Sequence, residues 1–196
     1  MRHLTLPFLL CALIIELMPA VSAAESPLFH WTMDAPKGVD VQDTTGHGYP
    51  GILLQGHHQH PLPSRHPDAG IRGGAVRIES RSIIRAQRIH PVGSAWTLSF
   101  WIHQDDRYTS VHRLLVLPGL DFWMDSDNVR VVFSGLGTLT GKRITPERWE
   151  HILIRVEPGE VTLYINGFPA AKKTKASWHY PHAGARLEFG ATDWHR

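Results

Sequence analysis

The clearest evidence for the fold class is the segment Ala95-Trp-Thr-Leu-Ser-Phe-Trp-Ile-His103. Bulky apolar residues recur at every second position, so one face of an extended strand carries Trp96, Leu98, Phe100 and Ile102. The other face carries Thr97, Ser99, Trp101 and His103. One apolar face and one mixed face predict a β-strand that covers a core on one side only.

The same period of two continues along the chain from residue 28. Trp149 to Val156 alternates in this way, and Val161 to Ile165 is followed by Asn166-Gly167, which is a strong signal for a tight hairpin turn. Long helical spacing is absent, and one helical turn at most is expected at Thr145–Arg148. These patterns predict an all-β chain folded as a two-sheet antiparallel β-sandwich.

The charge balance excludes one class of partner. The 196 residues hold 20 Lys and Arg against 18 Asp and Glu, a formal net charge of +2, and basic residues form no run longer than a pair. We therefore expect no nucleic-acid partner. The single cysteine, Cys11, permits no internal disulfide, so the core must stabilise the domain.

Residues 1–23 have the pattern of a secretory signal peptide. A positive start is followed by an apolar run from Leu4 to Met18, and Val21-Ser-Ala23 supplies small residues at a cleavage site. The apolar run is shorter than the roughly 20 residues of a membrane span. We expect a mature domain of residues 24–196, without a transmembrane span, that is secreted to the cell exterior or the periplasm.

Several segments, in order, resemble the laminin-G-like, concanavalin A-like lectin/glucanase jelly-roll family. The segments that carry the resemblance are Leu28–Trp31, Asp43–Gly51, Gly73–Ile78, Ala95–Trp101, Trp149–Ile152 with Leu163–Gly167, and Phe189–Ala191. The resemblance implies a jelly roll of two curved antiparallel sheets. It implies binding more often than catalysis, as in lectins, adhesion modules and glycan-binding appendages. Fold alone does not choose among these functions.

The family pattern also implies a final strand beside the first one, and we expect the sandwich to lack it. The first strand, Leu28–Met33, is then expected to have an unpaired edge of free N–H and C=O groups. Such an edge favours a homodimer or exchange of a strand with another protein.

Glycanases of this family carry Glu-x-Asp-x-Glu on one strand, and the nearest match here is Asp121-Phe-Trp-Met-Asp125. The central acid is replaced by Trp123, and both outer acids are the shorter Asp. Four strand residues span about 13 Å, more than the roughly 5–9.5 Å between catalytic carboxyl groups. We therefore predict no catalytic residues.

Many family members hold Ca²⁺ near the rim of the sandwich, which implies a structural calcium ion with Asp34 and Asp43 as ligands. The alternative is that Asp43 forms a turn completed by Gly46 and Gly48, which Asp does unaided. The histidines of Gly56–His60, with His66, could bind a transition metal, but no Cys or Glu completes a zinc pattern, so a solvated loop is expected.

Glycan binding needs exposed aromatic faces beside hydrogen-bonding groups. The candidate ligand-binding residues are Trp101, His103, Asp121, Trp123, Asp125, Trp178 and Tyr180. Trp31, Trp96 and Trp149 are assigned to the core instead. The leading hypothesis is a secreted, non-catalytic carbohydrate-binding module. The alternatives are an extracellular adhesion or assembly module that binds a cell-surface protein, and a degenerate glycan hydrolase.

Overall fold

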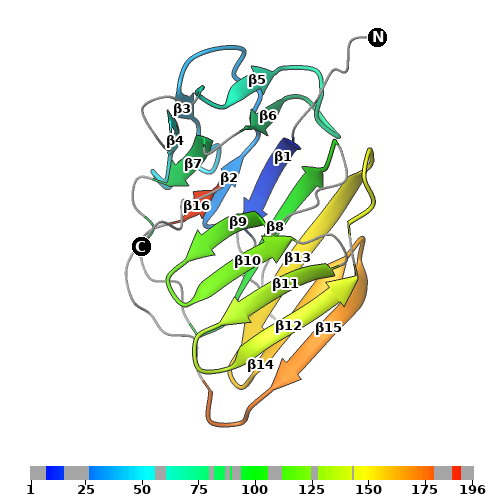
Figure 1. Ribbon diagram of the computed structural model, residues 1–196. Helices are drawn as coiled ribbons and strands as arrows, with labels where there is room; N and C mark the ends of the chain where they lie inside the picture. Colours follow the sequence, from blue (N-terminus) through cyan, green and yellow to red (C-terminus); the bar gives the residue numbers. More distant parts are fainter. Residues whose placement is uncertain are drawn as a thin grey trace.

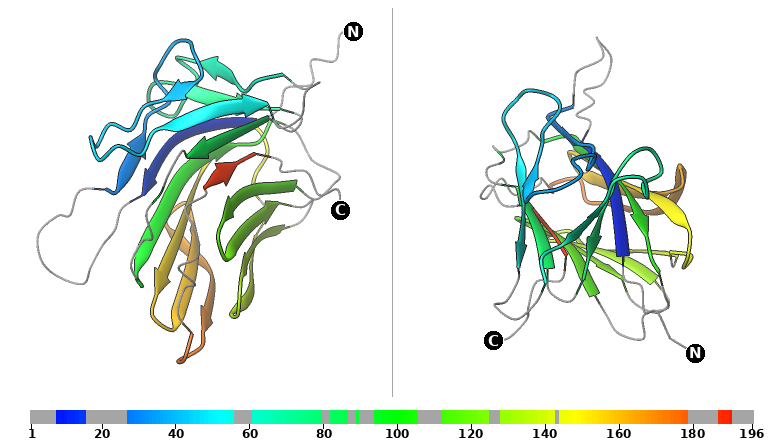
Figure 2. Two further views of the ribbon diagram at one scale, coloured as in Figure 1. Left: turned by 90° about the vertical axis from the view of Figure 1, so that its left-hand side faces the viewer. Right: turned by 90° about the horizontal axis from the view of Figure 1, so that it is seen from above.

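The computed structural model describes residues 8–15, 27–55, 61–79, 82–86, 89, 94–105, 112–124, 128–142, 144–178 and 187–190. Within these ranges every regular element is a β-strand and neighbouring strands run antiparallel, as the sequence predicts. Figure 1 shows two layers of strands packed against each other, and Figure 2 shows them from two further sides. Nowhere in the described ranges does the chain form a helix long and apolar enough to cross a membrane.

One sheet, called sheet A here, has the strand order β15-β14-β13-β8-β1-β6-β5, and β2 pairs with β1 beside this path. Its strands are β1 (Phe8–Ile15), β2 (Phe29–Trp31), β5 (Ser64–His66), β6 (Ala75–Ile78), β8 (Trp96–His103), β13 (Trp149–Glu157), β14 (Glu160–Ile165) and β15 (Phe168–Thr174).

The second sheet, sheet B, has the order β12-β11-β10-β9-β16-β7-β4-β3. Its strands are β3 (Asp40–Val41), β4 (Gly51–Gln55), β7 (Ser82–Ala86), β9 (His112–Leu117), β10 (Leu120–Met124), β11 (Asn128–Phe133), β12 (Gly137–Lys142) and β16 (Glu188–Phe189). Strand β16, drawn in red in Figure 1, lies inside the sheet between β7 and β9.

The core lies between the sheets and is rich in aromatic rings. Phe100 of sheet A meets Phe122 and Phe189 of sheet B, with centroid distances of 5.6 Å in both pairs. Trp31 adds an edge contact to Phe189 at 6.4 Å, and its indole N–H donates to the carbonyl oxygen of Tyr49. The expected burial of Trp31 and Trp96 is confirmed, with exposed fractions of 0% and 3%.

The predicted hairpin is confirmed in detail. Asn166 and Gly167 both have positive φ angles, 52° and 81°, and connect β14 to β15 through a loop of these two residues. The helical turn expected at Thr145–Arg148 is wrong, because Glu147 has a left-handed φ of 59°. Its N–H donates to Gln104 O at 2.6 Å, so a contact to the end of β8 replaces the helical turn.

The edge of Leu28–Met33, expected to be unpaired in the cleaved chain, is covered in the full chain. Strand β2 pairs with β1 through Leu13↔Trp31, Ile14↔His30 and Ile15↔Phe29. The residues that cover the edge therefore come from the segment predicted to be a signal peptide. Cleavage after Ala23 and self-association of the cleaved chain remain predictions.

Candidate functional site

Four rings form a compact block on the outer face of sheet A. Strands β8 and β13 pair so that Trp101 lies opposite His151 and His103 lies opposite Trp149. The ring centroids of these pairs are 5.0 Å and 5.3 Å apart, with interplanar angles of 42° and 57°. All four residues are half-buried, so their rings remain partly open to solvent. This ring block places two indoles and two imidazoles side by side on one surface.

Polar side chains fix the two imidazoles of the ring block. The Oγ of Ser99 lies 2.6 Å from Nε2 of His151, and Oδ1 of Asp105 lies 2.7 Å from Nδ1 of His103. Ser99 is only 8% exposed. Its hydroxyl therefore serves to orient His151 instead of facing a ligand.

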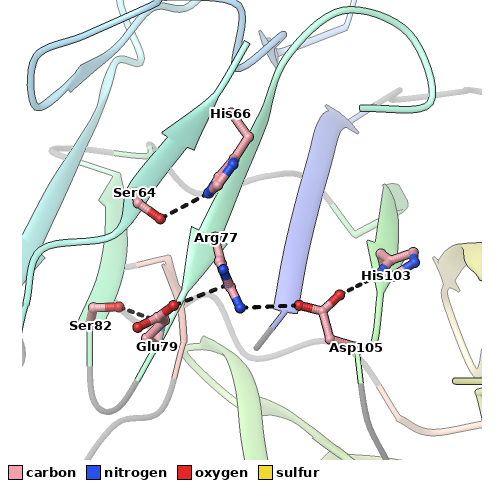
Figure 3. Close-up of polar contacts among 7 residues, drawn as sticks. All are labelled: Ser64, His66, Arg77, Glu79, Ser82, His103 and Asp105. Atoms are coloured by element: carbon pink, nitrogen blue, oxygen red, sulfur yellow. Dashed lines mark hydrogen bonds and ion pairs between the residues drawn. The ribbon is translucent and has the colours of Figure 1, made fainter. Parts of the chain in front are cut away.

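A charged network continues from the ring block toward β6. Arg77 forms ion pairs with Glu79 at 3.1 Å and with Asp105 at 3.7 Å, and Asp105 is also the partner of His103. Figure 3 shows that Arg77 and His103 come from strands on either side of β1. In the same view His66 lies on β5, where its Nε2 is 3.1 Å from Ser64 Oγ. The solvated loop expected to include His66 is wrong at this residue, because pairing with β6 makes it part of a strand, and Gly56–His60 lie outside the described residues.

Half of the ring block was not among the predicted ligand-binding residues. Trp149 was assigned to the core, but it is half-buried on the outer face, and His151 was not proposed as a ligand contact. The alternation along Trp149–Val156 carries the missing signal. It places Trp149 on the same face as His151, opposite the buried residues Ile152 and Ile154.

The other predicted platform lies on the opposite outer face of the sandwich. Asp121 and Trp123 belong to β10 of sheet B, whose alternate residues Phe122 and Met124 are buried in the core. Arg113 holds both side chains, since its guanidinium carbon lies 5.6 Å from the Trp123 ring centroid and the group also bonds to Asp121. One small ligand therefore could not contact Trp101 and Trp123 together.

The remaining predicted contacts do not join the ring block. Trp178 is 5% exposed, packs against Phe133 with a centroid distance of 5.8 Å, and donates its indole N–H to Ser134 O at 3.0 Å. The expectation that Trp178 is partly exposed is therefore wrong, because the segment folds back onto sheet B. Asp125 and Tyr180 lie outside the described residues.

The two proposed calcium ligands already accept hydrogen bonds from the protein, Asp43 within a turn and Asp34 from a distant segment. Oδ1 of Asp43 accepts hydrogen bonds from His30 N, Thr45 N and Thr45 Oγ1, and Oδ2 accepts one from Tyr49 N. Oδ1 of Asp34 accepts a bond from Gly74 N at 2.7 Å. In the described part of the chain, His, Cys, Asp and Glu form no group of three or more able to hold a metal ion.

These contacts also explain the acidity of Asp43. Partial burial alone would raise the pKa of Asp43, but hydrogen bonds from the Thr45 hydroxyl and the N–H groups of Tyr49, Thr45 and His30 outweigh it and lower the pKa. A carboxylate saturated by protein donors does not fit calcium, which prefers six to eight oxygen ligands. The residues present support the turn-forming alternative.

Comparison with known proteins gives one family match. The family model described as the concanavalin A-like lectin/glucanases superfamily matches residues 77–196. This range includes both strands of the ring block. No curated protein matches the chain.

Several solved structures share the fold at low sequence identity. Domain 4 of AbnA, a GH43 extracellular arabinanase from Geobacillus stearothermophilus in complex with arabinotriose, is 19% identical, with a TM-score of 0.58 over 78% of this chain and 79% of that domain. The binding domain of Paraclostridial Mosquitocidal Protein 1 is 17% identical, with a TM-score of 0.62 over 77% of this chain and 41% of the other.

A third similar structure is the binding domain of Botulinum Neurotoxin DC in complex with SialylT. It is 11% identical, with a TM-score of 0.58, and the match covers 81% of this chain and 44% of the toxin domain. The chain thus spans less than half of either of these two binding domains. At these identities the likeness shows the fold.

Proposed function

Because this chain belongs to the concanavalin A-like lectin/glucanase superfamily, we propose that it is a non-catalytic carbohydrate-binding module that binds sugar on the outer face of sheet A. The ring block of Trp101, His151, His103 and Trp149 carries the proposal. Sugars present apolar C–H faces edged by hydroxyl groups. The C–H faces can stack on the partly exposed indole rings, and the hydroxyl groups can bond to the imidazole nitrogens beside them.

The similar structures support a sugar ligand in general terms. The arabinanase domain is in complex with arabinotriose, and the botulinum toxin domain is in complex with SialylT. Both are matched over most of this chain, so the sandwich is compatible with glycan recognition. Function still depends on the site and not on the fold.

The geometry favours sheet A over sheet B as the binding face. The ring block offers four half-buried rings on two adjacent strands, whereas the guanidinium of Arg113 already occupies a position over Trp123. Asp121, a residue of the only glycanase-like motif found, is bonded to the same arginine. We therefore propose binding without hydrolysis, and without calcium.

The proposal includes export of the domain after cleavage behind Ala23. The support for this location is the leader-like sequence of residues 1–23. Export is consistent with a domain that meets glycans outside the cell. N-terminal sequencing of the protein recovered from its producing cells tests the cleavage, with Ala24 as the expected first residue.

A glycan array tests the function and the face together. We expect wild-type protein to bind at least one glycan, Trp101→Ala to lose at least about tenfold in affinity, and Trp123→Ala to bind as wild type. Trp123→Ala is the matched control, because it removes the same ring from the opposite face. If only Trp123→Ala loses glycan affinity, the binding site lies on sheet B instead.

Absence of glycan binding by a folded wild-type protein would contradict the proposed function. The hypothesis of an adhesion or assembly module that binds a protein would then take its place. Turnover of a glycan, lost in Asp121→Asn, would instead support the hydrolase alternative.

A further inference from the structure

Strand β1 is an interior strand of sheet A with partners on both sides. On one side it pairs with β8, from Leu9↔His103 to Ile14↔Ser99. On the other side its first half pairs with β6 and its second half with β2, from Phe8↔Ile78 to Ile15↔Phe29. Figure 1 shows β1, in dark blue, between β8 and the β5–β6 pair. Loss of β1 would therefore separate the sheet into two parts.

The residues of β1 are the centre of the predicted signal peptide. Cleavage behind Ala23 removes them from the domain, so they cannot serve both as a leader that is discarded and as a permanent strand. Cleavage would leave this position of the sheet without its strand. Its edges are the backbone groups of β8 on one side and of β6 and β2 on the other.

A contact outside β1 connects the two sides of this position. Arg77 of β6 and Asp105 at the end of β8 approach to 3.7 Å, although β1 lies between their strands. Figure 3 shows this ion pair reaching past the end of β1. Asp105 is 5% exposed and Arg77 is 13% exposed, so solvent screens the pair only partly. The ion pair favours a spacing of β6 and β8 that fits one strand.

The neighbouring strands also determine which kind of strand fits. Their inward-facing residues next to β1 are apolar and at most 3% exposed: Phe29, Trp31, Val76, Phe100 and Ile102. An empty position would uncover these side chains and leave unpaired backbone groups, both of which cost free energy. An apolar extended segment restores both the hydrogen bonds and the burial.

We propose that the position between β8 and β6 is a strand-acceptor site. Residues 8–15 occupy it in the uncleaved chain. After the predicted cleavage it binds an extended, uncharged, apolar strand of another polypeptide, antiparallel to β8. Backbone hydrogen bonds provide the affinity, and the apolar inner face selects the sequence.

The test begins with the full chain, which carries a specific protease site placed directly behind Ala23. Cutting then separates residues 1–23 without removing them. We expect native mass spectrometry to find both parts bound together, with the amides of β8 and β6 still protected from hydrogen exchange. Wash-out of residues 1–23 in mild denaturant is expected to expose these amides and to lower the melting temperature.

After residues 1–23 have been washed out, a peptide of residues 8–15 is added to refill the position. The peptide carries flanking lysines for solubility and the substitution Cys11→Ser. We expect it to restore the exchange protection of β8 and β6. The Leu10→Pro peptide is expected to bind at least about tenfold more weakly than the Ala12→Pro peptide. Leu10 pairs with both Ile102 and Val76, whereas Ala12 falls at the register shift and pairs with no residue of β8.

Three results would overturn the proposal. The first is release of residues 1–23 with no change in melting temperature or in exchange at β8 and β6. The second is exposure of these amides that the peptide does not reverse. The third is equal binding of the two proline peptides, which would indicate nonspecific apolar association. None of these results depends on glycan binding.

Discussion

The rings of Phe100 and Phe122 meet across the core with their centroids 5.6 Å apart and an interplanar angle of 78°. This contact joins the middle of β8 in sheet A to the middle of β10 in sheet B. Side chains alternate along a strand, so the next residues, Trp101 and Trp123, point away from the core. The contact therefore assigns the two tryptophans to opposite outer faces.

The first prediction concerns energetic coupling on these faces, measured without any ligand. In a double-mutant cycle of urea unfolding, Trp101→Ala and His151→Ala are expected to show a coupling of about 0.5–1.5 kcal/mol, because the two rings are in contact. Trp101→Ala and Trp123→Ala serve as the control pair, and their effects should add within about 0.5 kcal/mol. Coupling of the control pair would contradict the separation of the faces.

The second prediction compares two tryptophans by burial. Trp178→Ala should lower the free energy of unfolding by about 3–5 kcal/mol, because it leaves a cavity beside Phe133 and removes the hydrogen bond to Ser134 O. Trp101→Ala, at a half-buried surface position, should cost about 1 kcal/mol. Chemical denaturation monitored by circular dichroism measures both. Equal costs would show that Trp178 does not belong to the core.

The third prediction concerns the pH dependence that Asp43 adds to stability. The pKa of Asp43 is lower in the folded chain, so its contribution is present above the unfolded pKa of about 3.9 and is lost as the pH falls through the folded pKa. Asp43→Asn should cost about 2 kcal/mol at pH 7. This difference from wild type should shrink as the pH falls below about 4.

Equilibrium unfolding between pH 7 and pH 2.5 measures the effect of Asp43→Asn. The exposed residue Asp68 provides the control variant, and Asp68→Asn should stay within about 0.5 kcal/mol of wild type. Adding millimolar calcium should leave the melting curve of the wild type unchanged. A calcium-dependent rise in melting temperature would contradict the assignment of Asp43 as a turn former.

The fourth prediction tests the packing around Trp31. A Cβ at Gly51 would lie 3.0 Å from Cη2 and Cζ2 of Trp31 and 3.2 Å from Cβ of Val41. Trp31 is fully buried and bonded to Tyr49 O, so it cannot move aside, and Gly51→Ala should cost about 1–3 kcal/mol. Thermal unfolding measures this loss.

Gly46→Ala is the control that separates the cost of tight packing from the cost of backbone strain. A Cβ at Gly46 has no neighbour within 4 Å, but the residue has a φ of 79°, so its cost of about 1 kcal/mol comes from the backbone alone. A Gly51→Ala variant as stable as wild type would show that Trp31 has room to shift.

Local patterns of the sequence predicted much of the fold. The alternation along Ala95–His103 identified β8 and its buried face, and Asn166-Gly167 identified the β14–β15 turn, because both signals depend only on neighbouring residues. Fold class, which follows from many such strands, was predicted correctly.

The errors lie where contacts distant in sequence decide the structure. The hydrogen bond from Glu147 N to Gln104 O replaces a helical turn, and the return of Trp178 onto Phe133 buries a residue expected to be partly exposed. The candidate site was half predicted. Trp101 and His103 follow from β8 alone, whereas their pairing with Trp149 and His151 depends on the register between β8 and β13.

Both sheets take an interior strand from near an end of the described chain: β1 in sheet A, and β16, between β9 and β7, in sheet B. Within β16, Glu188 pairs with Arg85, a partner 103 positions away. Sheet B therefore cannot be complete before residue 189 has left the ribosome or the export channel. Such a high contact order predicts slow folding of sheet B, with apolar strand edges accessible to chaperones until β16 pairs.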